Sequence, residues 1–349
     1  MRTAVVILNW NTEKLLEAFL PPMLASCPPD AEVIVADSGS TDGSLELLSR
    51  RFPAVRTIAL GENLGFTGGY NKALAQIDAE FYCLVNSDID VSPGWLEPLV
   101  AFMDANPECG VCGPKLHALE RTPDGGFRRT DRFEYAGAAG GLMDRYGYPF
   151  CRGRVMKRTE IDSGQYDDAG RSLWVSGACL LTRSSLWHAL GGFDKRFFAH
   201  MEEIDYCWRA ALEGWWTSVV PASCVWHLGG GTLGQESPFK LELNFRNNLL
   251  LLDKNLARTV GTPLARLRIG VRRMLDWGSA LVYLMGGSPA RFKAVARAHA
   301  GYRKLRGKGV AAPRWRIKVA GYCEKCVILQ SLLRGAGVFR YLKDYEDSH

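Results

Sequence analysis

The sequence predicts an α/β protein with a Rossmann-like, mostly parallel sheet flanked by helices, followed by a helical C-terminal region. Between residues 2 and 106, short apolar runs alternate with segments of helical periodicity. This is the pattern of parallel strands joined by crossover helices. From Phe239 onward the periodicity is helical. We therefore divide the chain into a sheet-containing domain, residues 1–238, and a C-terminal helical region, residues 239–349.

Polar residues follow each apolar run in the first part of the chain. Parallel strands joined by right-handed crossovers end at one edge of a sheet, so these polar residues should lie close together. Ligands of open α/β sheets bind at that edge. The expected strands are 2–8, 32–36, 55–60 and 81–90, with helices at 13–24 and 44–51 and a glycine-rich turn, 62–72, that leads into a helix ending at Ile77.

The remainder of the chain is less regular before it becomes helical. Residues 116–171 are rich in Gly, Arg, Asp and aromatic residues. We expect long surface loops and short strands there, where substrate selectivity tends to reside. The other expected elements are a helix at 93–106, strands at 110–115, 174–183 and 219–225, a helix at 184–190, and C-terminal helices at 240–257, 263–285, 289–306 and 315–333.

Charge is distributed unevenly along the chain, whose net charge is +6. Between Lys254 and Lys343, 20 Lys and Arg residues stand against only Asp276 and Glu324, a balance of +18. Such a basic region indicates an anionic partner, either nucleic acid or a phospholipid surface. Two interpretations of its helices remain open: packed helices with solvated basic faces, or helices that bind at a membrane interface.

The composition is that of a globular protein, with 47% hydrophobic residues. No uncharged apolar segment reaches the roughly 18 residues of a membrane-spanning helix. The first residues enter a strand without a signal-peptide pattern, and ten cysteines are scattered through the chain. We therefore expect reduced thiols and a cytoplasmic protein.

Two aspartates, Asp88 and Asp90, end the apolar run that begins at Phe81. Because side chains alternate along a strand, both carboxylates should point to the same side and can bind one hard cation with the phosphates it carries. The alternative is a strand that ends in an Asx turn. His227, which follows the strand at 219–225, is either a further metal ligand or an ordinary hydrogen-bonded histidine.

Three carboxylates, Glu202, Glu203 and Asp205, crowd the start of a helix after an aromatic run. Like charges at short range raise a carboxylate pKa toward the value that a general base needs. The alternative is structural, because the dipole of a helix favours acidic residues at its N-terminus.

Taken together, seven separated segments resemble glycosyltransferase family 2, the inverting enzymes of the GT-A fold that use nucleotide-sugar donors. The resemblance covers about residues 1–250. More narrowly, the chain looks like the branch that contains bacterial rhamnosyl- and galactofuranosyl-transferases. The matching segments, in the order of the family, are Val6–Asn11, Val33–Ser44, Asn63–Asn71, Asn86–Asp90, Trp174–Arg183, Glu202–Asp205 and His227.

The resemblance implies roles for individual residues. Asp37 would accept a hydrogen bond from the pyrimidine base of the donor. Asp88, Asp90 and His227 would hold Mg²⁺ or Mn²⁺ on the donor diphosphate. The remaining residues that it implies are Asn9, Asn11, Ser38, Asn63, Gly65, Asn71, Lys72, Asn86 and Ser87 for donor binding, and Trp174, Gly177 and Ala178 on the acceptor side.

The same resemblance makes Glu203 the general base that deprotonates the acceptor hydroxyl in a single displacement. The sequence departs from the family here, because Asp is usual at this place, and Glu202 or Asp205 remain alternatives. Asp205 is expected to orient the helix or the acceptor instead. A second departure is Ser38, where Asn is usual.

By resemblance, residues 1–238 form a nucleotide-sugar-binding catalytic domain that transfers a sugar to a glycan or lipid-linked glycan during cell-surface polysaccharide synthesis. We expect dTDP-L-rhamnose as the donor, with a UDP-sugar as the second choice. The basic region fits an enzyme docked peripherally on an anionic membrane surface, at the inner face of the cell membrane.

Two other classes of protein explain fewer of these observations. A sugar-nucleotide nucleotidyltransferase would need a glycine-rich loop with basic residues near its N-terminus, and residues 9–14 do not form one. A non-catalytic nucleic-acid-binding protein would account for the basic region but not for the acidic remainder. No nucleic-acid recognition motif is present, so we expect no nucleic-acid partner.

Overall fold

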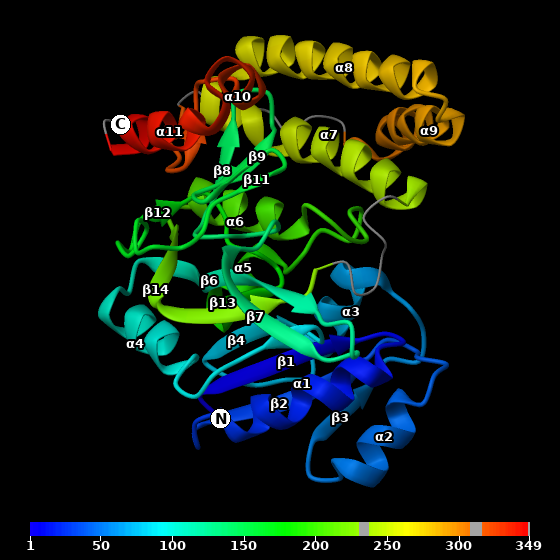
Figure 1. Cartoon of the computed structure of the whole chain (residues 1–349), viewed down its shortest axis with the longest axis vertical. Helices are drawn as coiled ribbons and strands as arrows, with labels where there is room; N and C mark the ends of the chain where they lie inside the picture. The colour runs from blue at the N-terminus through cyan, green and yellow to red at the C-terminus, as the bar shows by residue number, and fades with distance from the viewer. Residues whose placement is uncertain (230–236, 308–315, 348–349) are drawn as a thin grey trace.

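Figure 1 shows the computed structural model, which describes residues 1–229, 237–307 and 316–347. A large sheet and its helices occupy one end of the long axis of the molecule. The long helices of the C-terminal region occupy the other end, with a smaller sheet between the two. These helices are α7 (Pro238–Val260), α8 (Thr262–Met285) and α9 (Pro289–Leu305).

The large sheet confirms the expected α/β class. Its strands are β1 (Thr3–Asn9), β2 (Ala31–Asp37), β3 (Arg56–Ala59), β4 (Phe81–Asn86), β5 (Ile89–Asp90), β6 (Cys109–Arg121), β7 (Phe127–Phe133), β12 (Arg171–Ser172), β13 (Cys179–Arg183) and β14 (Trp216–His227). Their order is β12-β14-β6-β13-β4-β1-β2-β3, with β5 on β14 and β7 on β6. β1 to β4 are parallel, as expected, whereas β13 runs antiparallel to β4 and β6.

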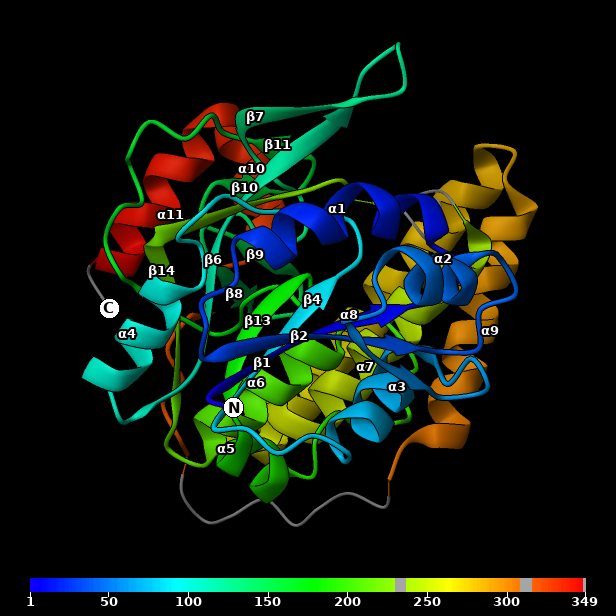
Figure 2. The same ribbon diagram turned by 90° about the horizontal axis from the view of Figure 1, so that it is seen from below.

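Alternating side chains divide the core into two layers, one on each face of the sheet. Val5 and Ile7 join the cluster under one set of helices, and Ala4 and Val6 join the cluster under the other. Figure 2 shows α1 and α3 on opposite sides of β1 and β2. The first set is α1 (Glu13–Ala25), α2 (Ser44–Arg51) and α4 (Glu97–Ala105); the second is α3 (Gly65–Leu74), α5 (Ser184–Leu190) and α6 (Glu202–Leu212).

Residues 116–171 contain the expected short strands, but these build an ordered sheet rather than lying within long surface loops. β6 continues to Arg121, and much of the chain between β7 and β12 forms a second, five-stranded sheet whose residues Met143 and Phe150 are buried. One of its strands comes from residues 322–323, far along the chain, so no local pattern could indicate this sheet. The strands are β8 (Gly141–Asp144), β9 (Pro149–Cys151), β10 (Arg154–Val155), β11 (Arg158–Thr159) and β15 (Tyr322–Cys323).

The helix expected at 315–333 is much shorter in the structure, and Trp315 itself lies outside the described residues. Tyr322 and Cys323 pair with β8 instead, and the Asp144 carboxylate accepts a hydrogen bond from the Val327 N–H at 3.0 Å. That bond satisfies the N–H of Val327, the first residue of a helix, which has no partner within the helix itself. The last elements are α10 (Val327–Arg334), the 3₁₀ turn η1 (Gly335–Gly337) and α11 (Val338–Asp347).

The C-terminal helices pack onto the rest of the protein. Leu249, Leu252 and Leu256 of α7 belong to the same buried cluster as Val6 and Tyr70. Residues before and after position 238 thus share one hydrophobic core. The domain division at residue 238 stays a prediction. Among the described helices, none is long and apolar enough to cross a membrane.

Candidate active site

The carboxyl ends of β1, β2 and β4 meet at one edge, and the register pairs Asn9 directly with Asp37. The Asn9 amide donates to the Asp37 carboxylate at 2.7 Å and to the Ser40 hydroxyl at 3.1 Å. The Gly39 and Ser40 N–H groups donate to the other oxygen of Asp37. Because Asn9 and Asp37 are buried, this network gives the edge a fixed polar floor.

Other predicted donor-binding residues order the loops around this floor. Asn11, with a φ of 54°, accepts a hydrogen bond from the backbone of the loop after β2 at 2.7 Å. The Ser38 hydroxyl donates to a carbonyl of the glycine-rich turn at 3.1 Å, and Asn63 accepts from the Gly65 N–H at 2.9 Å. Ser87 accepts from a threonine hydroxyl at the start of α1. These residues lie where the sequence places them.

Three residues assigned to ligands by resemblance have structural contacts instead. Asn71 makes two hydrogen bonds to the backbone of Phe193, at 2.8 and 2.9 Å. The Lys72 ammonium donates to a carbonyl just after β3 at 2.8 Å. The buried indole of Trp174 packs on Gly141 and donates to a carbonyl of β8. In this structure these three side chains contact the protein itself, and their assignment to the donor or the acceptor side stays a prediction.

The predicted metal ligands do not all converge. Ser87 and Asp88 form a turn between β4 and β5, so the strand alternation assumed for Asp88 and Asp90 is interrupted. The Asp88 carboxylate lies 3.2 Å from Nε2 of His227. Asp90 instead makes a bidentate ion pair with Arg129, at 2.7 and 2.9 Å. Within the described part of the chain, no group of three or more His, Cys, Asp or Glu side chains is arranged to hold a metal ion.

Asp88 and His227 nevertheless fit two ligands of a divalent cation. Mg²⁺ is typically bound through one or two carboxylates and the substrate phosphates, so few protein ligands are needed. Both side chains are buried, and the Asp88 carboxylate is the kind of ligand that suits Mn²⁺ or Mg²⁺. The other ring nitrogen of His227 lies 3.5 Å from Glu134, too far for a good hydrogen bond. Burial opposes protonation, but Asp88 and Glu134 raise the pKa of His227 well above its usual range.

Glu134 and Lys240 are site residues that the sequence patterns do not indicate. Glu134 follows β7 within the irregular stretch, and Lys240 lies in the first turn of α7, on the far side of the predicted domain division. Burial lowers the pKa of Lys240, while Glu134 and Asp88 act in the opposite direction. The start of α7 is therefore near enough for the Lys240 ammonium to interact electrostatically with Asp88 and Glu134. Neither residue belongs to a motif or a periodic face that could have identified it.

The segment before the acidic helix is strained. Phe198, His200 and Met201 have φ values of 65°, 70° and 73°, a conformation that costs energy for residues other than glycine. Side chains of α7 hold it: Nδ2 of Asn247 donates to three carbonyls between residues 197 and 200, and the Arg246 guanidinium also donates to the Phe197 carbonyl at 2.8 Å. The segment also touches the glycine-rich turn, where a Cβ on Gly65 would lie 2.5 Å from the Phe198 ring.

Glu203 is partly exposed as a residue, but one of its carboxylate oxygens is buried and unpaired. Its Oε2 has no hydrogen-bond partner among the described atoms, and burial raises the pKa of Glu203 to about 7. A Cβ on Gly177 would lie 3.5 Å from that of Glu203, so the predicted acceptor-side strand borders this carboxylate. Ala178 accepts a backbone hydrogen bond from Asn86 there. Burial and the charge of Glu203 raise the pKa of Glu202 well above its usual range.

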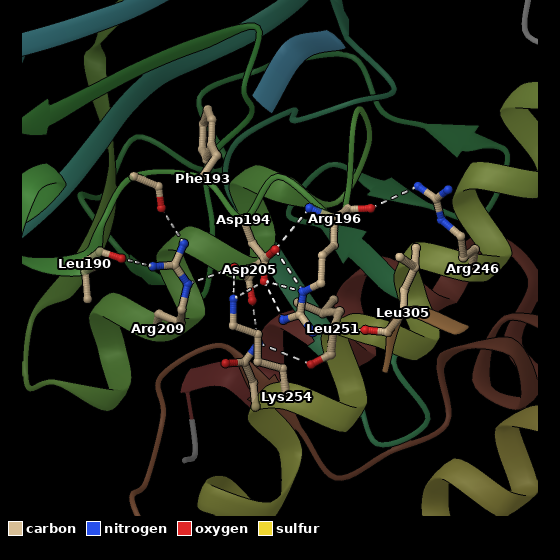
Figure 3. Close-up of polar contacts among 12 residues, drawn as sticks. Leu190, Phe193, Asp194, Arg196, Asp205, Arg209, Arg246, Leu251, Lys254 and Leu305 are labelled. Carbon is tan, nitrogen blue, oxygen red and sulfur yellow. Dashed lines mark hydrogen bonds and ion pairs between the residues drawn. The ribbon is translucent and has the colours of Figure 1, made fainter. Parts of the chain in front are cut away.

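Asp205 lies two residues after Glu203 and therefore on the opposite side of α6, where Figure 3 shows it among Arg209, Lys254 and Asp194. It is fully buried and accepts hydrogen bonds from Arg209 at 2.7 Å and from Lys254 and Asn255 at 2.9 Å. Lys254 also bonds Asp194 at 2.8 Å, so the network ties α6 to α7 and to the segment before the strained loop. The geometry gives Asp205 a structural role.

Comparison with known proteins bears on the family. Residues 4–154 match the sequence profile described as Glycosyl transferase family 2. The chain is 30% identical over 260 residues to the N-acetylglucosaminyl-diphospho-decaprenol L-rhamnosyltransferase of Mycobacterium tuberculosis, covering 71% of this chain and 83% of that protein. It is also 22% identical over 292 residues to the low-salt glycan biosynthesis hexosyltransferase Agl10 of Haloferax volcanii, covering 78% and 84%.

Solved structures share the fold. The chain superposes on GalNAc-T7, crystallised with UDP, GalNAc and Mn²⁺, with a TM-score of 0.56 and 16% identity. That likeness covers 72% of this chain and 48% of GalNAc-T7, and it concerns the fold alone. The resemblance seen in the sequence is thus confirmed by both the profile and the mycobacterial relative. The chain belongs to glycosyltransferase family 2 and is a glycosyltransferase of the GT-A fold.

Proposed function

We propose that the protein transfers a sugar, with inversion, from a nucleotide-sugar donor to a lipid-linked glycan acceptor. The observation that carries the proposal is the state of Glu203: its Oε2 is buried and unpaired among the described atoms, burial raises its pKa to about 7, and it lies beside the predicted acceptor-side residue Gly177. A base with such a pKa can remove a proton from a hydroxyl near neutral pH. A single base suffices for an inverting displacement, since no covalent intermediate forms.

The polar edge would hold the donor. The floor formed by Asn9 and Asp37 would meet the nucleotide base, and the loops around Asn11 and Asn63 would line it. Asp88 and His227 would hold Mg²⁺ or Mn²⁺, which would neutralise the charge of the departing diphosphate. Glu203 would then take the proton of the acceptor hydroxyl as the sugar is attacked.

The strained segment, 197–201, supports this arrangement. It joins the glycine-rich turn on the donor side to the acidic helix that carries Glu203. The Thr67 N–H donates to the Phe198 carbonyl at 3.1 Å. A shift of the glycine-rich turn would therefore also move the segment that leads into α6, which carries Glu203. Strained backbone persists where surrounding contacts hold it, and such positions cluster at active sites.

The choice of substrates rests on the relatives. The mycobacterial relative, by its name, transfers L-rhamnose onto N-acetylglucosaminyl-diphospho-decaprenol. We therefore favour dTDP-L-rhamnose as the donor, with a UDP-sugar second, and an isoprenoid-linked acceptor. Such an acceptor lies in a membrane, where we expect the protein to work peripherally at the inner face. Incubating the purified protein with each donor, Mn²⁺ and a diphospho-lipid-linked N-acetylglucosamine tests this, and no transfer from any donor would contradict it.

Asp88→Asn is expected to weaken activation of sugar transfer by Mn²⁺ by at least about tenfold, because it removes a negatively charged ligand. The matched control is Asp90→Asn, which makes the same change two residues away at the carboxylate held by Arg129. Titrating Mn²⁺ at saturating donor measures both. Equal losses would show that Asp90 is also a ligand when the donor is bound, and an unchanged Asp88→Asn profile would remove Asp88 from the site.

A further inference from the structure

Helix α8 exposes an apolar face and buries a polar one, the reverse of an ordinary surface helix. Leu267, Met274 and Leu281 lie seven residues apart and therefore on one face, and their exposed fractions are 64%, 70% and 54%. Met285, at the end of the same face, is 80% exposed. A water-soluble helix normally buries such a face and exposes its charges. This apolar strip is therefore an unusual surface that indicates a partner.

The opposite face of α8 is polar and buried, and its contacts fix the rotation of the helix. Arg272 pairs with Asp276 at 2.7 Å and donates to backbone carbonyls of the turn between β8 and β9. Arg268 donates to the Tyr322 hydroxyl at 2.5 Å and to Glu324. Turning the apolar strip inward would break these bonds and leave the buried polar groups without partners. The exposure of the strip is thus built into the packing of α8.

Basic residues border the strip. Arg266 and Arg273, both exposed and seven residues apart, lie on one flank of it. Leu332 and Leu333 of α10 are 78% and 70% exposed, and Figure 1 places α10 at the same end of the molecule as α8. Apolar side chains bordered by arginine are the composition of helices that lie in a membrane interface.

We infer that the exposed face of α8 docks on an anionic lipid bilayer, with the helix lying in the plane of the surface. The inference deepens the proposed function and rests on it for the acceptor, which is lipid-linked. A second copy of the chain is the competing occupant. A symmetric dimer through this face would bring the Arg266 and Arg273 side chains of the two copies together, and Asp276, the acidic residue of α8, is buried and cannot offset their charge. Anionic lipid has the complementary charge.

Flotation with vesicles tests the inference without donor or acceptor, so its failure is separate from failure of the proposed function. The full chain should float with vesicles of phosphatidylglycerol and phosphatidylcholine at low salt, and much less with phosphatidylcholine alone. The double variant Leu267→Gln with Leu281→Gln should lower the partition coefficient at least about tenfold, because it removes buried methylene groups from the interface. The double variant Arg266→Gln with Arg273→Gln should make flotation with the anionic vesicles less dependent on salt concentration.

The matched control is Leu45→Gln with Ile161→Gln, two residues that are 40% and 58% exposed outside α8. This control should float like the unaltered chain, and circular dichroism should show the same melting temperature for all variants, since every substituted side chain is exposed. Equal flotation of the α8 double variant would overturn the inference. A dimer in sedimentation velocity that the α8 variant converts to a monomer would identify a second copy as the occupant and also overturn it.

Discussion

Glu203→Gln is expected to reduce the rate of sugar transfer by about 10²–10⁴-fold, the usual contribution of a positioned general base. Glutamine keeps the size and one acceptor oxygen of the side chain but cannot take a proton. Because burial raises the pKa of Glu203 to about 7, the unaltered enzyme should lose activity as the pH falls below 7 and level off above it. The residual activity of the variant should lack that dependence. Initial rates between about pH 5.5 and 9, at saturating donor and Mn²⁺, measure both effects.

Glu202→Gln is the matched control, on the adjacent residue of the same helical turn. Burial and the charge of Glu203 raise the pKa of Glu202 well above its usual range, which favours the neutral form of its carboxyl group. Glutamine resembles that neutral form, and turnover should stay within a few-fold of the unaltered enzyme. If Glu202→Gln abolished transfer while Glu203→Gln kept it, the base would be Glu202.

The parts of the fold that the sequence predicts are those with local patterns. Each early strand is followed within the same segment by the helix that covers it, so apolar periodicity locates β1 to β4 and their helices. The second sheet has no such pattern, because its strands are mostly two to four residues long and β15 pairs with β8 across nearly the whole C-terminal region. The helix expected at 315–333 fails for the same reason: Tyr322 pairs with a distant strand, which no helical periodicity records.

The residues of the candidate site also divide into those that the sequence predicts and those that it does not. Asn9 and Asp37 could be predicted because strand ends converge in a parallel sheet, and the register places them side by side. The partner of Asp90 could not, since Arg129 reaches it from another strand 39 residues away. Glu134 and Lys240 also join the site only through tertiary packing. Motifs thus indicate where the polar edge lies, and the folded chain decides which side chains face it.

Asp205→Asn is expected to lower the free energy of unfolding by about 3–5 kcal/mol, the range for breaking a buried ion pair by removing one partner. The Asp205 carboxylate has no solvent exposure and faces both Arg209 and Lys254 (Figure 3). Asparagine keeps the shape but not the charge, so two basic groups lose a counter-ion inside the protein. Denaturation by urea, followed by circular dichroism, measures the change. Glu213→Gln is the control, because its ion pair with Arg258 is half-exposed and should contribute less than about 1 kcal/mol.

The same variant distinguishes a structural carboxylate from a catalytic one. Asp205 holds α6 against α7 and lies two residues from Glu203, on the opposite side of the helix. Turnover of the folded Asp205→Asn protein at low temperature should therefore stay within about tenfold of the unaltered enzyme, and its activity should still fall as the pH drops below 7. A fully folded Asp205→Asn protein with no transfer and a flat pH profile would make Asp205 the base. A loss of stability with retained sugar transfer would instead show that α7 supports the acidic helix through this buried network. Residues beyond 238 would then be part of the structure that the catalytic domain needs.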